Sequence, residues 1–197
     1  MAVILFVTHP EVVIDPKVPV PKWPLSEQGR ARMEAFASDP VLRRVRAIYA
    51  SGERKAIDGA DILASHLSVP FTVDEALGEN DRSATGYIAP PEFWEVVDQF
   101  FARPTESIRG WERAADAQSR IVSAVRRIAQ HGEEGDIAIV SHGGVATLLM
   151  AYLRGADHAR PFAQPHRGGG CYFVIDRERF TLREGWRMID PELRVEG

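Results

Sequence analysis

Two histidines in this sequence each come directly after a short apolar run and one hydroxyl residue. The first run covers residues 2–7 and leads to His9, and the second covers residues 137–140 and leads to His142. Both runs contain β-branched residues that do not alternate with polar ones, which is typical of strands buried on both faces of a parallel sheet. Because ligands bind beyond the carboxyl ends of such strands, His9 and His142 are predicted to share a functional site.

Histidines placed in this way suit an attack on phosphorus. An unprotonated ring nitrogen attacks a phosphoryl group when the other ring nitrogen donates to a backbone carbonyl, and His9 is placed for that role. The reaction also needs positive or hydrogen-bonding groups for the phosphoryl oxygens and a proton for the leaving oxygen. The candidates are His142, Lys55, Ser51 and backbone N–H groups for the oxygens, and Glu79, or alternatively Glu11 or Asp81, for the proton.

The segment Ser141-His142-Gly143-Gly144 belongs to a wider pattern. Leu25-Ser26-Glu27-Gln28-Gly29 precedes it, and Ala50-Ser51-Gly52-Glu53-Arg54-Lys55 joins a predicted strand to a predicted helix. In these segments the sequence resembles the histidine phosphatase superfamily, also called phosphoglycerate mutase-like. The signature of that family is a first-strand Arg-His-Gly followed downstream by Ser-His-Gly-Gly. The resemblance extends over residues 2–175.

The resemblance implies specific roles for several residues. It implies that His9 forms a phosphohistidine and that Lys55 stands where the family carries a second arginine. The acidic proton donor of the family matches Glu79 within Leu77-Gly78-Glu79. No cofactor and no metal ion are implied.

The first motif departs from the family pattern. Thr8 stands at the arginine position and Pro10 at the glycine position, so a permanently charged, bidentate phosphate ligand is replaced by one hydroxyl. Lys55 keeps a charge but lacks the planar fork of arginine. Each charge-assisted hydrogen bond contributes on the order of 1.5 to 3 kcal/mol, so these changes are expected to weaken transition-state binding. The candidates for the missing charge are Arg54, Arg82, His166 and Arg167, of which Arg167 is favoured because its glycine-rich loop lies near the expected sheet end.

The elements that position these residues can be predicted from hydrophobic periodicity and from turn residues. Helices alternate with strands, which predicts an α/β fold: a three-layer α/β/α sandwich with a mainly parallel central sheet and antiparallel pairing at its edge. The prolines of segment 10–24 predict an extended loop, and segment 74–90 is expected to be irregular. No linker divides the chain, so residues 1–197 are predicted to form a single domain. Strands are expected at 2–7, 45–50, 137–140, 171–175 and 180–187, with a further short strand within 67–73. Helices are expected from the N-cap Ser26 to residue 37, and at 53–66, 91–101, 111–131 and 145–153.

The composition excludes several classes of protein. Of the 197 residues, 45% are hydrophobic and 26% are charged, which is ordinary for a globular protein. A net charge of −4 provides no electrostatic surface for nucleic acid. Cys171 is the only cysteine, which excludes an intramolecular disulfide and a thiolate zinc cluster. The N-terminal apolar run is too short to span a membrane and no basic residue precedes it, so a cytoplasmic location is expected.

The leading functional hypothesis is therefore a metal-independent phosphatase. It would hydrolyse a small phosphomonoester through a phosphohistidine on His9, with His142, Lys55, Thr8, Ser51 and Arg167 around the phosphoryl oxygens. The alternative is a domain of the same fold that binds a phosphoryl ligand or a partner with little or no turnover. A metal site made of His9, His142 and Glu79 is a third hypothesis. The substrate and the oligomeric state stay open.

Overall fold

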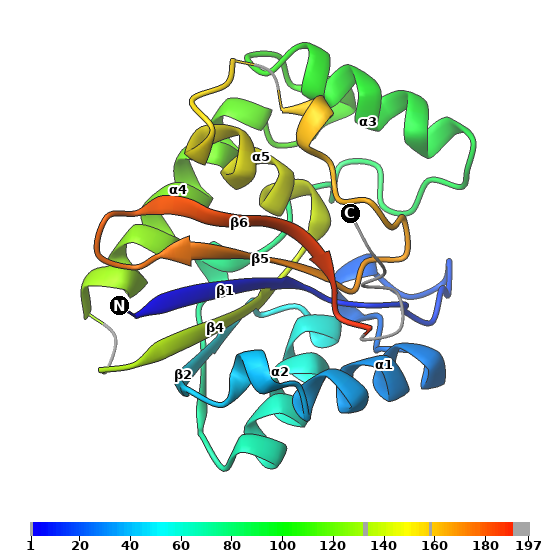
Figure 1. Cartoon of the computed structure of the whole chain (residues 1–197). Coiled ribbons are helices and arrows are strands. Elements are labelled where there is room, and N and C mark those ends of the chain that lie inside the picture. Colours follow the sequence, from blue (N-terminus) through cyan, green and yellow to red (C-terminus); the bar gives the residue numbers. More distant parts are fainter. Residues whose placement is uncertain (1, 132–133, 158, 191–197) are drawn as a thin grey trace.

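A six-stranded sheet runs through the middle of the protein in the order β3-β2-β4-β1-β5-β6 (Figure 1). The structure, a computed structural model, describes residues 2–131, 134–157 and 159–190. Met1 and residues 191–197 of the predicted single domain lie outside the described residues. The strands are β1 (Val3–Thr8), β2 (Val45–Ala50), β3 (Phe71–Val73), β4 (Asp136–Ser141), β5 (Cys171–Asp176) and β6 (Thr181–Met188).

The sheet is parallel on one side and antiparallel on the other. β1 pairs with β4, β4 with β2, and β2 with β3, all in parallel, whereas β5 and β6 form an antiparallel hairpin beside β1. The central strand β4 is buried along its whole length, and β6 is largely open to solvent as an edge strand. This confirms the prediction of a mainly parallel sheet with antiparallel pairing at its edge.

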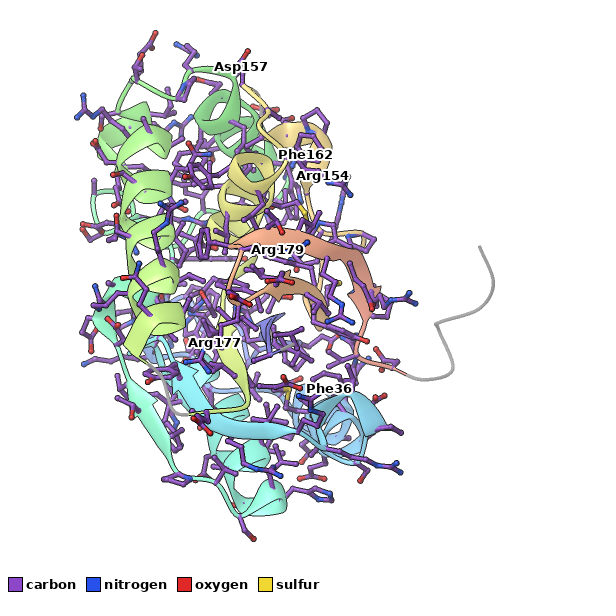
Figure 2. The ribbon with its side chains drawn as sticks, turned by 60° about the vertical axis from the view of Figure 1, so that its left-hand side comes forward. Phe36, Arg154, Asp157, Phe162, Arg177 and Arg179 are labelled. Atoms are coloured by element: carbon purple, nitrogen blue, oxygen red, sulfur yellow. The ribbon has the colours of Figure 1, made fainter. Side chains whose placement is uncertain are left out.

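Helices cover both faces of the sheet. One face carries α1 (Glu27–Ala37) and α2 (Arg54–Leu67), and the other carries α3 (Glu92–Ala102), α4 (Ala114–His131) and α5 (Gly143–Leu153) (Figure 1). A hydrophobic core lies on each face of the sheet, and alternate side chains of β1 pack into the two cores. Leu5 and Val7 face α1 and α2, while Ile4 and Phe6 face α4 and α5. Figure 2 shows Phe36 of α1 on one side of the sheet, and Phe162, after α5, on the other. The predicted three-layer α/β/α sandwich is therefore confirmed.

Two helix starts differ from their prediction by two residues or more, and the other helix boundaries lie within one residue of it. α4 begins at Ala114 rather than at residue 111, because Gly110 has a positive φ of 82° and Trp111 is extended with its side chain buried in the core. α5 begins at Gly143 rather than at residue 145, which leaves His142 as its N-cap. The backbone N–H groups of Gly143 and Gly144 therefore belong to the first turn of α5, where they have no partner within the helix.

Short 3₁₀ helices occur in the connecting loops, at Val20–Lys22, Pro40–Leu42, Glu75–Leu77, Ile108–Gly110 and Arg160–Phe162. The first of these lies within the proline-rich segment after His9. Among the described residues, no helix combines the length and the apolar character that crossing a membrane requires.

Candidate active site

The register of the parallel pair β1 and β4 brings the two predicted histidines together. Thr8 lies opposite Ser141, and the His9 N–H donates to the Ser141 carbonyl over 3.0 Å. The two imidazole rings therefore meet just beyond the strand ends, with centroids 5.2 Å apart and ring planes at 69°.

His9 is held in an orientation that suits a nucleophile. Its Nδ1 lies 2.8 Å from the Pro10 carbonyl oxygen, so Nδ1 carries the proton and Nε2 keeps its lone pair. Burial, the nearby His142 and the charge of Lys55 lower the pKa of His9 to about 3. His9 is therefore unprotonated at neutral pH.

His142 is buried, and its two ring nitrogens have different environments. Nε2 lies 2.7 Å from Ser51 Oγ and 3.5 Å from Glu53 Oε1, whereas Nδ1 has no hydrogen-bond partner among the described residues. Burial lowers the pKa of His142, and the carboxylates of Glu53 and Glu79 oppose that effect. Ser51 also lies in the site, since its hydroxyl accepts the Glu53 N–H over 3.2 Å.

Glu79 binds the open first turn of α5. Its carboxylate accepts the N–H of Gly144 and the N–H of Val145, each over 3.0 Å, and lies 3.2 Å from the Arg82 guanidinium. Burial alone would raise the pKa of Glu79, but Arg82, His142 and the Gly144 N–H outweigh it and lower that pKa below its ordinary value. The predicted proton donor is therefore next to the second histidine, and in this arrangement its carboxyl group is ionised.

Lys55 lies within the site but is engaged by protein groups. Its buried ammonium donates to the Val20 carbonyl over 2.9 Å and to Glu53 Oε2 over 2.5 Å. Its charge is close enough to lower the pKa of His9. The predicted phosphate ligand is in place, but it is already paired with a carboxylate.

Thr8 faces a neighbouring loop. Its buried hydroxyl donates to Gln164 Oε1 over 2.8 Å and accepts the Cys171 N–H over 3.1 Å. Gln164 also lies against α5, because a Cβ built on Gly143 would come within 2.4 Å of Gln164 Nε2. The hydroxyl at the position of the family arginine therefore holds a glutamine amide beside the start of α5.

The four residues considered for the missing charge lie in different places. Arg167 is exposed and stacks over Trp94, 4.9 Å from the ring centroid. Arg54 is exposed on α2 and pairs with the buried Asp58, and His166 Nδ1 lies 3.2 Å from the Gly169 carbonyl. Arg82 acts on the site, since its charge lowers the pKa of both Glu79 and His142.

The alternative proton donors have other partners. Both oxygens of Glu11 lie 2.8 Å from Arg32, which also binds Asp190. The exposed Asp81 carboxylate accepts the Ser83 N–H over 2.8 Å. These contacts favour Glu79 over both alternatives.

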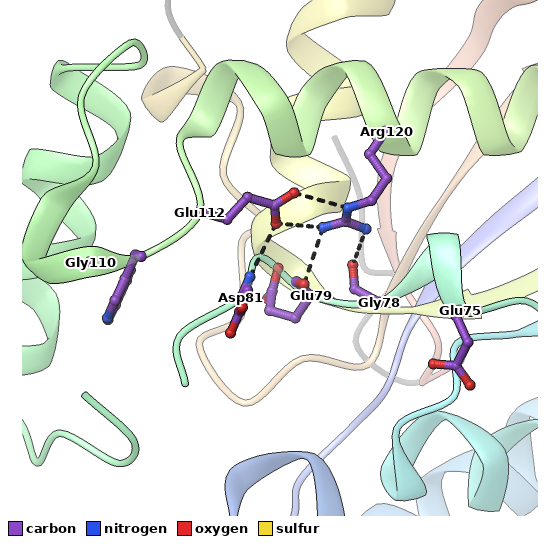
Figure 3. A pocket seen from close by; sticks show the side chains of 8 residues that line it. Glu75, Gly78, Glu79, Asp81, Gly110, Glu112 and Arg120 are labelled. Atoms are coloured by element: carbon purple, nitrogen blue, oxygen red, sulfur yellow. Dashed lines mark hydrogen bonds and ion pairs between the residues drawn. The ribbon is translucent and has the colours of Figure 1, made fainter. Parts of the chain in front are cut away.

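Arg120 on α4 supports the loop that carries Glu79 (Figure 3). Its guanidinium donates to the carbonyls of Ala76 and Gly78 over 2.9 Å each, and to the Glu79 carbonyl over 3.2 Å. Glu112 binds the same guanidinium over 2.7 Å. An open cavity of about 480 Å³ lies beside this support, lined by Glu75, Gly78, Glu79, Asp81, Gly110, Trp111, Glu112 and Arg120.

The glycine-rich loop packs directly on the His9 backbone. Gly169 has a φ of +78°, and a Cβ on it would lie 2.0 Å from the His9 carbonyl oxygen. We expect Gly169→Ala to lower the free energy of unfolding by about 3 kcal/mol or more, because left-handed strain adds to a backbone clash. Chemical denaturation measures the effect.

Gly155→Ala is the matched control for that substitution. Gly155 also has a positive φ, 64°, but a Cβ there meets nothing within 4 Å. Gly155→Ala should lower the free energy of unfolding by only about 1 to 2 kcal/mol, which is the penalty of the left-handed conformation alone. Equal losses in the two variants would show that the close approach to His9 has no energetic consequence.

Sequence reasoning missed Glu53, Gln164 and Arg120. Glu53 had a signal that could have found it, since it lies between two residues already predicted for the site, Ser51 and Lys55. Gln164 and Arg120 carried no such signal, because a polar loop residue and a helix arginine are ordinary on a surface.

Within the described part of the chain, no three or more His, Cys, Asp or Glu side chains are grouped so as to hold a metal ion. Glu79, which the metal hypothesis used as a ligand, is bound instead by backbone N–H groups.

Several solved structures share the fold of this chain. Among solved structures, YhfR of Bacillus stearothermophilus superposes with a TM-score of 0.78 at 23% identity, over 93% of this chain and 95% of that one. The mycobacterial glucosyl-3-phosphoglycerate phosphatase Rv2419c gives 0.75 at 19% identity, over 95% of each chain. A putative alpha-ribazole-5'-P phosphatase from Escherichia coli gives 0.72 at 19% identity, over 96% of this chain and 100% of that one. These likenesses show a shared fold.

A search of curated protein sequences finds no match. The family model of the histidine phosphatase superfamily, branch 1, matches residues 19–184. This match begins after His9, so the altered first motif lies outside it. Because it covers most of the chain, the resemblance seen in the sequence is confirmed, and the protein belongs to branch 1 of the histidine phosphatase superfamily.

Proposed function

We propose that this protein is a phosphatase that hydrolyses phosphomonoesters through a phosphohistidine on His9. The observation that carries the proposal is the state of His9: Nδ1 is held by the Pro10 carbonyl, and the lowered pKa leaves Nε2 unprotonated. Nε2 would attack phosphorus, forming a P–N bond as the bond to the leaving oxygen breaks. Water would then attack the phosphohistidine, which releases inorganic phosphate and restores His9.

His142 would bind a phosphoryl oxygen through Nδ1. The Ser51 hydroxyl oxygen accepts the Glu53 N–H, so its own proton is available for His142 Nε2. In that arrangement the His142 proton resides on Nδ1, the buried ring nitrogen that has no partner among the described residues. A bound phosphoryl oxygen would satisfy this donor, which supports a phosphoryl site beside His9.

One observation favours the second candidate function, a phosphoryl-binding domain with little turnover. Lys55 is already paired with Glu53, and Thr8 stands where the family carries an arginine. Such a domain would bind phosphate with an affinity that does not depend on His9. Its turnover would be absent in the parent protein as well as in His9 variants.

The substrate is proposed only as a class, a small phosphorylated molecule. The names of two structural relatives, which refer to a glucosyl-3-phosphoglycerate and an alpha-ribazole-5'-phosphate, make these compounds sensible members of a test panel. A cytoplasmic location and the absence of nucleic-acid and membrane partners stay predictions from the composition.

The proposal is tested by phosphate release in the presence of a chelator. We expect turnover of a phosphomonoester panel, including an aryl phosphate, to be unchanged by the chelator. Quenching in alkali, where phosphohistidine survives, should leave a phosphoryl group on the peptide that contains His9. Loss of turnover with chelator, or a phosphoryl group on another residue, would contradict the mechanism.

A further inference from the structure

Glu53, the acidic residue that directly precedes α2, lies at the centre of the site. Its side chain is only 15% exposed, although a glutamate on an ordinary surface would extend into water. Oε1 accepts the Glu79 N–H over 3.1 Å and lies 3.5 Å from His142 Nε2, while Oε2 is bound by Lys55.

These partners are the kinds of group that bind a phosphoryl oxygen. An ammonium and a backbone N–H are donors that proteins commonly direct at phosphate. Here both bind one carboxylate of the protein itself, and the His142 imidazole lies beside it. Lys55 was also predicted from the sequence to hold a phosphoryl oxygen, so Glu53 competes with phosphate for this donor.

The electrostatics of the site agree with this geometry. Burial by itself would raise the pKa of Glu53, but His142 and Lys55 lower it to about 2, so the carboxylate is ionised at neutral pH. A phosphoryl group with negative charge that approached His9 would meet this fixed negative charge within the same cluster.

We propose that the Glu53 carboxylate is an internal competitor that takes the place of a phosphoryl oxygen, so that an anionic ligand binds strongly only after displacing it from Lys55 and the Glu79 N–H. The proposal rests on the proposed function in one respect, namely that the ligand of this site is a phosphoryl group. Glu53 would thereby restrict the site to ligands whose remaining contacts offset the displacement of the carboxylate, and simple phosphate would bind weakly.

The test compares the affinity for inorganic phosphate of the parent protein and Glu53→Gln. The amide keeps the shape of the side chain and removes its charge, so we expect the dissociation constant for phosphate, measured by calorimetry, to fall at least about tenfold, equivalent to about 1.4 kcal/mol. Glu53→Asp keeps the charge on a shorter side chain, and its affinity should lie between those of the parent and Glu53→Gln.

Glu75→Gln is the matched control. The Glu75 carboxylate lies beside Gly52, since a Cβ on Gly52 would meet its oxygens at 2.2 and 2.3 Å, and Glu75 is exposed. Glu75→Gln removes one negative charge close to Gly52 but leaves the contacts of Lys55 and His142 unchanged. Phosphate affinity should therefore change less than about threefold. Melting temperatures establish that each variant is folded.

The outcomes separate this inference from the proposed function. Equal affinities of the parent, Glu53→Gln and Glu53→Asp, or an absence of phosphate binding by the folded Glu53 variants, would overturn the inference. An equal gain in Glu75→Gln would also overturn it, because general electrostatics would then explain the effect. Failure of the proposed function would appear elsewhere, as turnover that does not depend on His9 or as no turnover at all.

Discussion

His9→Ala is expected to lower phosphate release by at least about a thousandfold, because it removes the attacking nitrogen of a two-step reaction. The other histidine of the site cannot replace it, since His142 is buried and its Nε2 is engaged by Ser51. Initial rates with an aryl phosphate measure the loss, and the phosphohistidine trapped in alkali should disappear with it.

Two controls make this result specific. His66→Ala removes an exposed histidine from the last turn of α2 and should leave the rate within about twofold, as is usual for surface substitutions. Imidazole added to His9→Ala should restore part of the turnover, because it supplies the missing nitrogen at the vacated position. A His9→Ala variant that is folded and retains the parent rate would exclude His9 as the nucleophile.

Glu79→Gln is expected to reduce the hydrolysis of an alkyl phosphate about a hundredfold to ten-thousandfold, which is the usual contribution of a general acid. An aryl phosphate with an acidic phenol should lose far less, because its leaving oxygen needs little protonation. Comparing the two substrates is informative because Glu79 is ionised in the structure, where its carboxylate binds the first turn of α5 and Arg82. The carboxyl group would need to take up a proton when the phosphoryl group binds.

The leaving group distinguishes this role from a merely structural one. If Glu79 only caps α5, the substitution should lower both rates by the same factor. Asp81→Asn is the matched control, since this neighbouring acid is exposed and bonds to Ser83. It should change both rates by less than about threefold.

The layers of the fold were predictable because hydrophobic periodicity is a local property. Residues 2–7 and 137–140 are apolar without alternation, which predicts strands that are buried on both faces. In the structure, β1 and β4 occupy the centre of the sheet. The exact starts of α4 and α5 were not predictable. They depend on the conformation of Gly110 and on carboxylate capping by Glu79, which a residue type does not specify.

That the two histidines meet was also predictable, since each follows a strand and the carboxyl ends of parallel strands lie at one edge of the sheet. Their protonation state was not predictable. The pKa of His9 depends on burial and on the positions of His142 and Lys55. The partner of Thr8 is Gln164, which lies 156 residues away in the chain.

The sequence by itself determined the α/β architecture, the family and the pair of histidines, because each of these is written in local patterns and in short motifs. Only the tertiary structure decided which groups those histidines meet. It placed the Glu53 carboxylate on Lys55 and beside His142, and it tied Glu79 to the first turn of α5. The physical reason is that the energy of a charge depends on distances of a few ångströms between side chains from different strands and loops, and these distances are set by how the sheet and its helices pack together.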